Sequence, residues 1–343
     1  MLEEEIPISP HIIFLGLIQI EGIGFQTLYK YFQEGKCLSS LMMVENLRDF
    51  TSLLGRTINN NESFSHFLSG VIKKGEELLQ ELNNKGIKFL LNSDYNFPNF
   101  PSNMKKPIYW LFIEGRLENL HISNALTLIG SRESTPVGHF LAQTLLFGTS
   151  NVKEPVVTIS GLAAGIDQIV HETSLLLNIP TIAVLGHGLY ETYPANSQKL
   201  RKDIIKCGGT IITEYFPHMK PNKESFVNRN RIQAALASAV IPLQWKQKSG
   251  TAHTIRFAYE MNKKICFVET NLCRNFLTEH ALANSSAQSD YGGDIFVLPN
   301  AINNLLEALG LKNFSKILFS VKTKTNPKDN DLSNQIRQID LDF

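Results

Sequence analysis

The chain has 343 residues, enough for about two domains of ordinary size. Hydrophobic residues make up 43% of it and charged residues 19%, which allows a large core and excludes a disordered chain. Its 33 Lys and Arg residues nearly balance its 32 Asp and Glu residues, giving a net charge of +1. Any surface that attracts nucleic acid must therefore be a local basic patch.

The sequence shows no sign of export or of membrane insertion. No apolar run approaches the roughly 18 residues that span a bilayer, and the start, MLEEEIPISP, is acidic where a signal peptide is basic. The cysteines, Cys37, Cys207, Cys266 and Cys273, form no CxxC pair, which argues against a zinc knuckle or a disulfide framework. We therefore expect reduced thiols in a cytoplasmic protein, with no membrane and no bound metal.

The first part of the chain, from residue 11 to about 85, has a helical pattern. Apolar residues precede a tight turn, Glu21-Gly22-Ile23-Gly24, and return after it at helical spacing. A longer segment, 62–85, places its apolar residues on one face, and Gly86 follows as a terminating glycine. We predict a helical N-terminal domain over residues 1–92.

Strand-like runs alternate with helical patterns from about residue 107 to 310. The predicted strands cover, in order, 107–113, 125–130, 156–160, 181–186, 210–214, 239–245, 264–268 and 294–299. Such alternation implies right-handed βαβ crossovers and an α/β fold with a doubly wound, mostly parallel sheet. We predict that this domain covers 93–312 and that 313–343 form a polar C-terminal tail.

Glycine, hydroxyl and basic residues recur where the predicted strands end. In an open α/β sheet, ligands bind beyond the carboxyl ends of the strands. Glycines allow backbone N–H groups to approach an anion, and helix N-termini add partial positive charge. The sequence therefore favours a phosphate-bearing ligand on this rim. The loops in question are Gly130-Ser131-Arg132, Ser160-Gly161 with Gly165, Gly186-His187-Gly188, and Lys246-Gln247-Lys248-Ser249-Gly250-Thr251.

Several polar residues near these loops have structural interpretations. We expect Asp167 to brace its helix, His171 to be packed, and His187 to be the more exposed histidine in a turn. Asn196 is the expected N-cap of a helix that carries Lys199, and its basic residues are expected to form a solvated face.

Glu214 is the carboxylate that most resembles a general base, but no second acid accompanies it in sequence. We therefore expect an ion pair with Arg229 or Arg231. The sequence contains no HExxH, GxSxG or GxxxxGK[ST] motif, which excludes metalloprotease, serine hydrolase and P-loop chemistry.

A set of motifs in fixed order resembles the DNA-processing protein A (DprA, or Smf) family over residues 11 to about 310. The motifs are GSR at 130–132, SGLAAGID at 160–167, GHGL at 186–189, YPAN at 193–196, FVNRNR at 226–231 and SGT at 249–251. The resemblance implies a Rossmann-like domain preceded by a small helical domain of helix-hairpin-helix or SAM-like type, whose turn corresponds to Gly22-Ile23-Gly24.

The function implied by this resemblance is that of a recombination mediator without enzymatic activity or cofactor. Family members bind single-stranded DNA with little sequence preference, form homodimers and help load the RecA recombinase during natural transformation. Among the motif positions, Arg132 matches a DNA-contacting arginine, and Gly161, Gly165, Arg229, Arg231 and the 249–251 loop match pocket-lining positions. The full set of expected DNA- or phosphate-binding residues is Gly130, Ser131, Arg132, Ser160, Gly161, Gly165, Asn196, Lys199, Arg229, Asn230, Arg231, Lys246, Lys248, Ser249, Gly250 and Thr251, supported by Asp167, His171, Glu214 and Phe226. Phe226 is a candidate for stacking a base, with burial as the alternative.

This chain also departs from the family pattern. Val227 stands where the family has proline, and Gln244-Trp245 stands where it has an acidic and a small residue. Pro242 interrupts a predicted central strand, and the segment 269–293 is longer and less regular than expected. A related role in DNA processing or defence is therefore kept beside DNA uptake.

Two other functions remain open at this stage. Nucleotide phosphoribohydrolases of the lysine-decarboxylase-like (LOG) type share a related fold and carry PGGxGTxxE, whereas this chain has QKSGTAHT with Thr254 in place of the glutamate. A nucleotide-sensing module without chemistry would use the same amide-rich rim.

Overall fold

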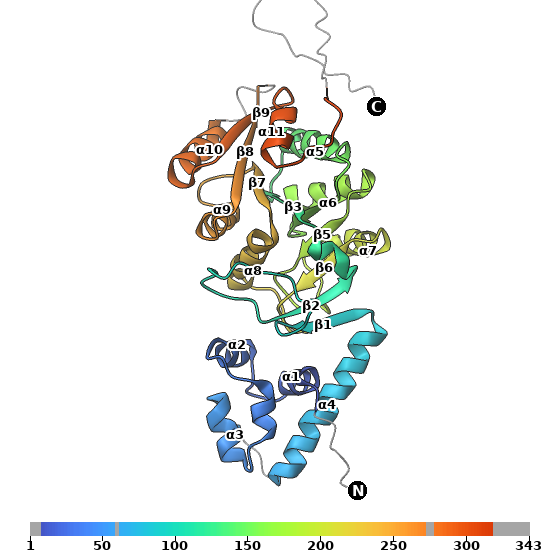
Figure 1. Cartoon of the computed structure of the whole chain (residues 1–343), viewed down its shortest axis with the longest axis vertical. Helices are drawn as coiled ribbons and strands as arrows, with labels where there is room; N and C mark the ends of the chain where they lie inside the picture. The colour runs from blue at the N-terminus through green and yellow to red at the C-terminus, as the bar shows by residue number, and fades with distance from the viewer. Residues whose placement is uncertain (1–7, 59–61, 272–277, 318–343) are drawn as a thin grey trace, which may run out of the picture.

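The computed structural model describes residues 8–58, 62–271 and 278–317. Over these residues the chain forms a layer of helices at one end and a nine-stranded sheet with helices on both faces (Figure 1). The strand order is β1-β2-β6-β5-β4-β3-β7-β8-β9. The predicted α/β class is confirmed.

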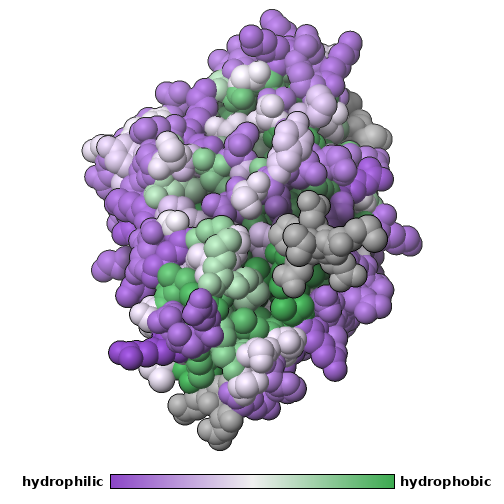
Figure 2. Space-filling model, turned by 60° about the horizontal axis from the view of Figure 1, so that its bottom comes forward, coloured by the Kyte–Doolittle hydropathy of each residue, from purple (hydrophilic) through white to green (hydrophobic). Residues whose placement is uncertain are grey.

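The helical end comprises α1 (Pro10–Leu17), α2 (Phe25–Gln33), α3 (Leu47–Leu54) and α4 (Phe64–Asn84), with a short 3-10 turn at Leu38–Met42. The Ser63 side chain accepts a hydrogen bond from His66 N and so caps the start of α4. Gly86, at a φ of 68°, follows its end in the left-handed region, as predicted for a terminating glycine. Figure 2, which brings this end forward, shows apolar surface between polar margins.

All eight predicted strands are present: β2 (Trp110–Gly115), β3 (Asn124–Gly130), β4 (Val156–Ser160), β5 (Thr181–Val184), β6 (Thr210–Thr213), β7 (Ala239–Gln244), β8 (Lys264–Thr270) and β9 (Asp294–Leu298). A ninth strand, β1 (Ile87–Leu91), was not predicted. It directly follows Gly86 and pairs antiparallel with β2, which pairs antiparallel with β6. The remaining pairs are parallel.

Helices cover both faces of the sheet (Figure 1). One face carries α5 (Pro136–Ser150), α6 (Ile166–Leu176) and α11 (Ile302–Ala308), whose apolar residues share a core with β3 and β7. The opposite face carries α8 (Lys223–Leu236), α9 (Gly250–Glu260) and α10 (Thr278–Tyr291). α7 (Gln198–Lys206) precedes β6, and short 3-10 turns lie at Leu117–His121 and Ala195–Ser197.

Aromatic side chains join the helical end to the sheet. The Phe14 ring lies 4.8 Å from that of Phe89 and 4.9 Å from that of Trp110, and Phe25 lies 5.2 Å from Trp110. These residues belong to one continuous buried cluster. β1, although it precedes residue 92, is part of the sheet, and the division of the chain into domains stays a prediction.

Two irregularities of the sequence have a structural explanation. Pro242 lies inside β7, where the pairing register with β3 shifts between Ile129 and Gly130, so the missing N–H falls at a bulge. Within the segment 269–293, residues 278–291 form the regular helix α10, and 272–277 lie outside the described residues. Most of the predicted tail, 318–343, lies outside the described residues. Among the described helices, none is both long and apolar enough to cross a membrane.

Candidate functional site

The predicted loops meet at one rim because β3, β4, β5 and β7 are parallel neighbours with their carboxyl ends together. The chain runs from β3 to β4 on one side, while β7 adjoins β3 on the other side. The order of the strands therefore changes direction beside β3, where ligands of open α/β sheets bind. The loops after β3, β4 and β7 border this point.

The loop that follows β3 is held by backbone contacts from two neighbours. Ile166 N donates to Ser131 O at 3.0 Å, and Ser131 N donates to Gln244 O at 2.6 Å. Gly165 has a φ of 80°, and a Cβ at this position would lie 2.3 Å from Ser131 O. Only glycine fits there without displacing the loop. The Arg132 backbone is thus fixed while its side chain remains exposed.

Arg132 extends over an aromatic ring on the rim. Its guanidinium carbon lies 5.4 Å from the centre of the Phe226 ring, and the Phe226 ring lies 5.1 Å from that of Tyr193. Phe226 is half-buried, whereas Tyr193 is 40% exposed. Arg132 forms no ion pair with Glu214 or Asp167 in the described part of the chain, so it does not brace the loops through them. We call Arg132, Tyr193 and Phe226 the rim cluster.

Arg229 lies beneath the rim, which corrects its predicted position as a direct phosphate ligand. Only 4% of the residue is exposed. Its Nη1 donates to Gly161 O at 2.7 Å and to Val184 O, and its Nε donates to Asn230 Oδ1 at 3.1 Å. A Cβ on Gly161 would lie 2.0 Å from the Arg229 Nη1, so glycine allows this approach. Arg229 holds the β4 and β5 loops together from below.

Arg231 is also buried, in the ion pair with Glu214 that the sequence predicted. Its Nη1 and Nη2 each lie 2.6 Å from a Glu214 carboxylate oxygen, and the two side chains are 4% and 3% exposed. Arg231 Nε also donates to Lys106 O at 2.9 Å. Burial opposes the charge, but the Glu214 carboxylate outweighs it and raises the pKa of Arg231. Neither residue is available for phosphate binding or general-base chemistry.

Asp167 and His171 have the structural positions expected of them. Asp167 is buried and accepts a hydrogen bond from Ala163 N at 3.4 Å. Burial raises the pKa of Asp167, and the Arg229 charge partly opposes that rise. His171 is fully buried, with Nδ1 2.7 Å from Thr181 Oγ1, and burial lowers its pKa to about 3. The imidazole is therefore neutral at physiological pH.

The expectation of an exposed His187 is wrong, because only 2% of the residue is exposed. Its ring nitrogens lie 2.9 Å from Gly188 O and 3.4 Å from Tyr193 O. Burial lowers the pKa of His187. The ring supports the turn that carries Tyr193.

The loop after β7 combines exposed cations with internal contacts. Lys246 and Lys248 are exposed, and Lys246 lies 3.0 Å from the Glu279 carboxylate. The Ser249 hydroxyl donates to Lys246 O at 2.6 Å, and Asn230 Nδ2 donates to Gly250 O at 3.1 Å. Thr251 is buried and Ser249 is half-buried, so the exposed residues of this loop are 246–248 and Gly250.

The amide of Gln244 accounts for one departure from the family pattern. Its Oε1 accepts hydrogen bonds from Thr135 N at 3.0 Å and from Thr135 Oγ1 at 3.3 Å. It therefore anchors the loop that leads into α5. Trp245 is buried, with Nε1 donating to Asn284 Oδ1 at 2.8 Å.

Three further predicted residues occupy different environments. Ser160 is buried and its hydroxyl donates to Leu128 O at 2.7 Å, so it does not face a ligand. Asn196 and Lys199 are exposed. The prediction that Asn196 is a helix N-cap is wrong, because it lies in a 3-10 turn and Ser197 precedes α7. Gly130 and Ser131 lie at the end of β3, beside Arg132.

Two rim residues escaped the sequence analysis. Tyr193 belongs to the YPAN motif, which indicated only a helix start. Its exposed ring lies beside Phe226 and is therefore accessible to a ligand. Lys223 is exposed at the first position of α8, three residues before Phe226. The i, i+3 spacing could have indicated that both share one helix face. No cluster suited to a metal ion occurs among the described residues.

Comparison with known proteins gives a family and a set of relatives. Residues 88–299 match the family described as DNA recombination-mediator protein A. Protein Smf of Synechocystis is 29% identical over 266 residues, which cover 75% of this chain and 64% of that protein. DNA processing protein DprA of Bacillus subtilis is 30% identical over 189 residues, 55% of this chain and 62% of that protein. The chain thus spans less than two thirds of the length of these relatives.

The solved structures that resemble this one include two of DNA processing protein A. DNA processing protein A of Streptococcus pneumoniae aligns with a TM-score of 0.60 and 23% identity, covering 84% of this chain and 95% of that one. DNA processing protein A of Helicobacter pylori, described for its single-stranded DNA binding mode, aligns with a TM-score of 0.55 and 30% identity. That alignment covers 65% of this chain and 96% of the other.

Proposed function

This chain belongs to the DNA recombination-mediator protein A family, and from that premise we propose that it binds single-stranded DNA along the rim. In this proposal it is a non-catalytic, cytoplasmic homodimer that protects the strand and helps load a RecA-type recombinase. Natural transformation is the first setting we propose, and a related DNA-processing or defence role is the second.

The rim cluster is the observation that carries the proposal. An exposed guanidinium binds a phosphate through charge-assisted hydrogen bonds, and Phe226 and Tyr193 offer ring faces on which bases stack. Every base has such a face, so the arrangement favours single strands of any sequence over a paired duplex. The backbone contacts of the β3 loop position Arg132 before DNA arrives.

Exposed cations around the cluster support a path for the phosphate backbone. Lys223 lies on α8, Lys199 on α7, and Lys246 and Lys248 in the loop after β7. Lys246 is paired with Glu279, so Lys199, Lys223 and Lys248 provide most of this local positive charge in a chain whose net charge is only +1. Contacts of this kind position a strand without identifying its bases.

The environment of Glu214 favours binding over phosphoribohydrolase catalysis. Its carboxylate is fully engaged by Arg231 and is 3% exposed. Thr254, where the catalytic glutamate of the LOG enzymes would stand, is a buried residue of α9. We therefore propose that the rim performs no chemistry.

A titration with fluorescently labelled DNA tests this function. We expect a mixed-sequence 30-mer to bind more tightly than a blunt duplex of equal length, with affinity falling as salt rises. Incubation with nucleoside monophosphates should release no free base. Binding of a mononucleotide as tight as that of the 30-mer would instead favour the nucleotide-sensing function, and steady base release would favour the enzyme.

A further inference from the structure

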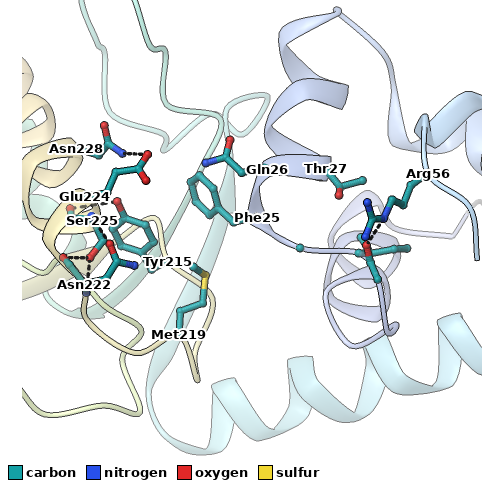
Figure 3. A pocket seen from close by; sticks show the side chains of 13 residues that line it. Phe25, Gln26, Thr27, Arg56, Tyr215, Met219, Asn222, Glu224, Ser225 and Asn228 are labelled. Atoms are coloured by element: carbon teal, nitrogen blue, oxygen red, sulfur yellow. Dashed lines mark hydrogen bonds between the residues drawn. The ribbon is translucent and has the colours of Figure 1, made fainter.

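A cavity of about 570 Å³ lies between the helical end and the start of α8. This volume is in the range of sites that hold small molecules. One wall comes from the Gly22–Gly24 turn with the first turn of α2, and the other comes from residues 215–228. Figure 3 shows Phe25 and Gln26 extending from α2 toward Tyr215, with Arg56 on the helical side and Glu224 on the α8 side.

The helical wall is suited to an anion. Arg56 is exposed, and its Nε donates to Gly22 O at 3.0 Å, which is the only hydrogen bond that its side chain makes with a described residue. Its two terminal nitrogens therefore remain for a ligand. Gly24 precedes α2 without a side-chain cap, and while Thr27 N donates to Gly24 O, the backbone N–H groups of Phe25 and Gln26 remain open on the same wall. A phosphate matches a guanidinium beside backbone amides.

The α8 wall has the opposite character. Glu224 is exposed and accepts one hydrogen bond, from Asn228 Nδ2 at 3.4 Å. It forms no ion pair with any described residue, Arg56 included. Beside it the half-buried Phe25 ring stacks on the Tyr215 ring, with centres 5.3 Å apart and planes 30° apart; Tyr215 is only 4% exposed, so the accessible aromatic surface is that of Phe25. A carboxylate accepts two adjacent N–H groups, and an aromatic surface accepts the face of a planar base.

One ligand class satisfies both walls. A simple anion would be repelled by Glu224, and a simple cation by Arg56. Guanine offers adjacent N–H donors, at N1 and the N2 amino group, on one base edge, and its nucleotides carry phosphate at the other end. We propose that this cavity binds a guanine nucleotide, with the phosphate toward Arg56 and the base edge at Glu224.

The nucleotide has two sources, a free molecule or a guanine within a DNA strand. α8 carries Phe226 of the rim cluster and Glu224 of the cavity two residues apart. A strand that crosses the rim cluster can therefore pass the start of α8 and place a base in the cavity. The strand source rests on the proposed function, whereas the free nucleotide does not.

The first arm of the test uses free ligands. Calorimetric titration should show GMP binding about tenfold more tightly than UMP, the discrimination expected for one paired hydrogen-bond contact. Glu224→Gln should abolish that preference, and the matched control Glu76→Gln, on the exposed face of α4, should keep it. Arg56→Gln should abolish the advantage of GMP over guanosine.

The second arm compares a 30-mer of thymine with one that carries a guanine at every fifth position. Removing a negative charge strengthens binding to any strand. We therefore expect Glu224→Gln to lose the preference for the guanine-containing 30-mer, while it binds the thymine 30-mer as tightly as the wild type or more tightly. Preference for guanine in this arm alone also supports the proposal and identifies the strand as the source.

The two arms separate this proposal from the proposed function. Absence of guanine preference in both arms overturns the cavity site, and normal binding of the thymine 30-mer then leaves the rim function intact. GMP binding that depends on Glu224, without binding of either 30-mer, supports the cavity and contradicts the rim function.

Discussion

Two layers of charge lie at the carboxyl ends of the strands, and they differ in what their charges contact. In the upper layer, Arg132 and Lys223 are exposed, and Arg132 faces an aromatic ring. In the lower layer, Arg229 and Arg231 are 4% exposed, and protein oxygens accept their hydrogen bonds. Arginines from neighbouring motifs thus have opposite roles. Those above are placed to bind a ligand, and those below hold the loops that place them.

Burial therefore decides whether an arginine at this rim can bind a ligand or holds the structure together. Taking a guanidinium out of water is costly unless acceptors satisfy it inside the protein. Once satisfied, it is a rigid structural element and no longer a ligand for phosphate.

The largest effect is expected when the buried ion pair is broken. Glu214→Ala leaves the Arg231 charge buried without its carboxylate and should lower the free energy of unfolding by about 3–5 kcal/mol. Urea denaturation followed by circular dichroism measures the change. The double variant Glu214→Gln with Arg231→Met, which removes both charges, should recover much of the loss. A loss of less than about 1 kcal/mol in the single variant would contradict a structural role for the pair.

The next effect concerns Gly165, which lets the β4 loop approach Ser131. In Gly165→Ala the residue must keep a φ of 80°, and its Cβ would lie 2.3 Å from Ser131 O. We expect a loss of about 2 kcal/mol in unfolding free energy from this strain. The Arg132 loop should also shift, so DNA affinity should fall. Gly70→Ala, at an open position of α4, is the control and should be neutral or stabilising.

The rim cluster should respond in binding and not in stability. Arg132→Ala should keep the wild-type melting temperature, weaken single-stranded DNA binding by about 1–3 kcal/mol and reduce the salt slope by about one. Phe226→Leu should weaken binding by a similar amount, about 1–3 kcal/mol, with an unchanged salt slope, because it removes stacking and no charge. Fluorescence anisotropy at several salt concentrations separates the two. Lost stability with an unchanged slope in Arg132→Ala would remove Arg132 from the DNA site.

The sheet could be predicted from the sequence because its strands are short apolar runs bounded by glycine and polar loops. The sequence analysis did not predict β1, because Ile87–Leu91 follows the end of α4 almost directly. Buried and more exposed residues alternate along this strand, and that pattern depends on its pairing with the antiparallel strand β2. Pairing between segments distant in sequence is set by packing, which local periodicity does not report. α10 escaped for a related reason, since its weakly amphipathic sequence gives little helical signal.

The sequence predicted which loops form the rim, but not which of their side chains are exposed and which are buried. The motifs identify which loops meet, because parallel strands place their ends together. They do not indicate whether a side chain such as Arg229 turns toward solvent or into the protein. The lack of a second acid near Glu214 in sequence predicted an ion pair with Arg229 or Arg231, and the structure identifies Arg231 as the partner. Tyr193 and Lys223 become visible only once α8 and the turn before α7 are placed side by side.

The last expected effect is the pH dependence that His171 gives to stability, which is measured as a slope and not as a change at one pH. Its pKa is about 3 in the folded protein, because burial disfavours the charged ring, against about 6.5 in the unfolded chain. Between these values the unfolded state binds the extra proton. The free energy of unfolding should therefore fall as pH decreases from about 6.5 toward 3, by at most about 1.4 kcal/mol per pH unit from this residue. Asp167, whose pKa is raised by burial, contributes in the opposite sense: its neutral form favours the folded state, so stability declines as pH rises above the unfolded value of about 3.9.

Urea denaturation between pH 4.5 and 7 should show a shallower slope for His171→Gln than for wild type. His66, exposed on α4, provides the matched control, because His66→Gln should leave the slope as it is. An equal slope in the His171 variant would mean that other groups of the buried layer, and not this imidazole, take up the proton on unfolding.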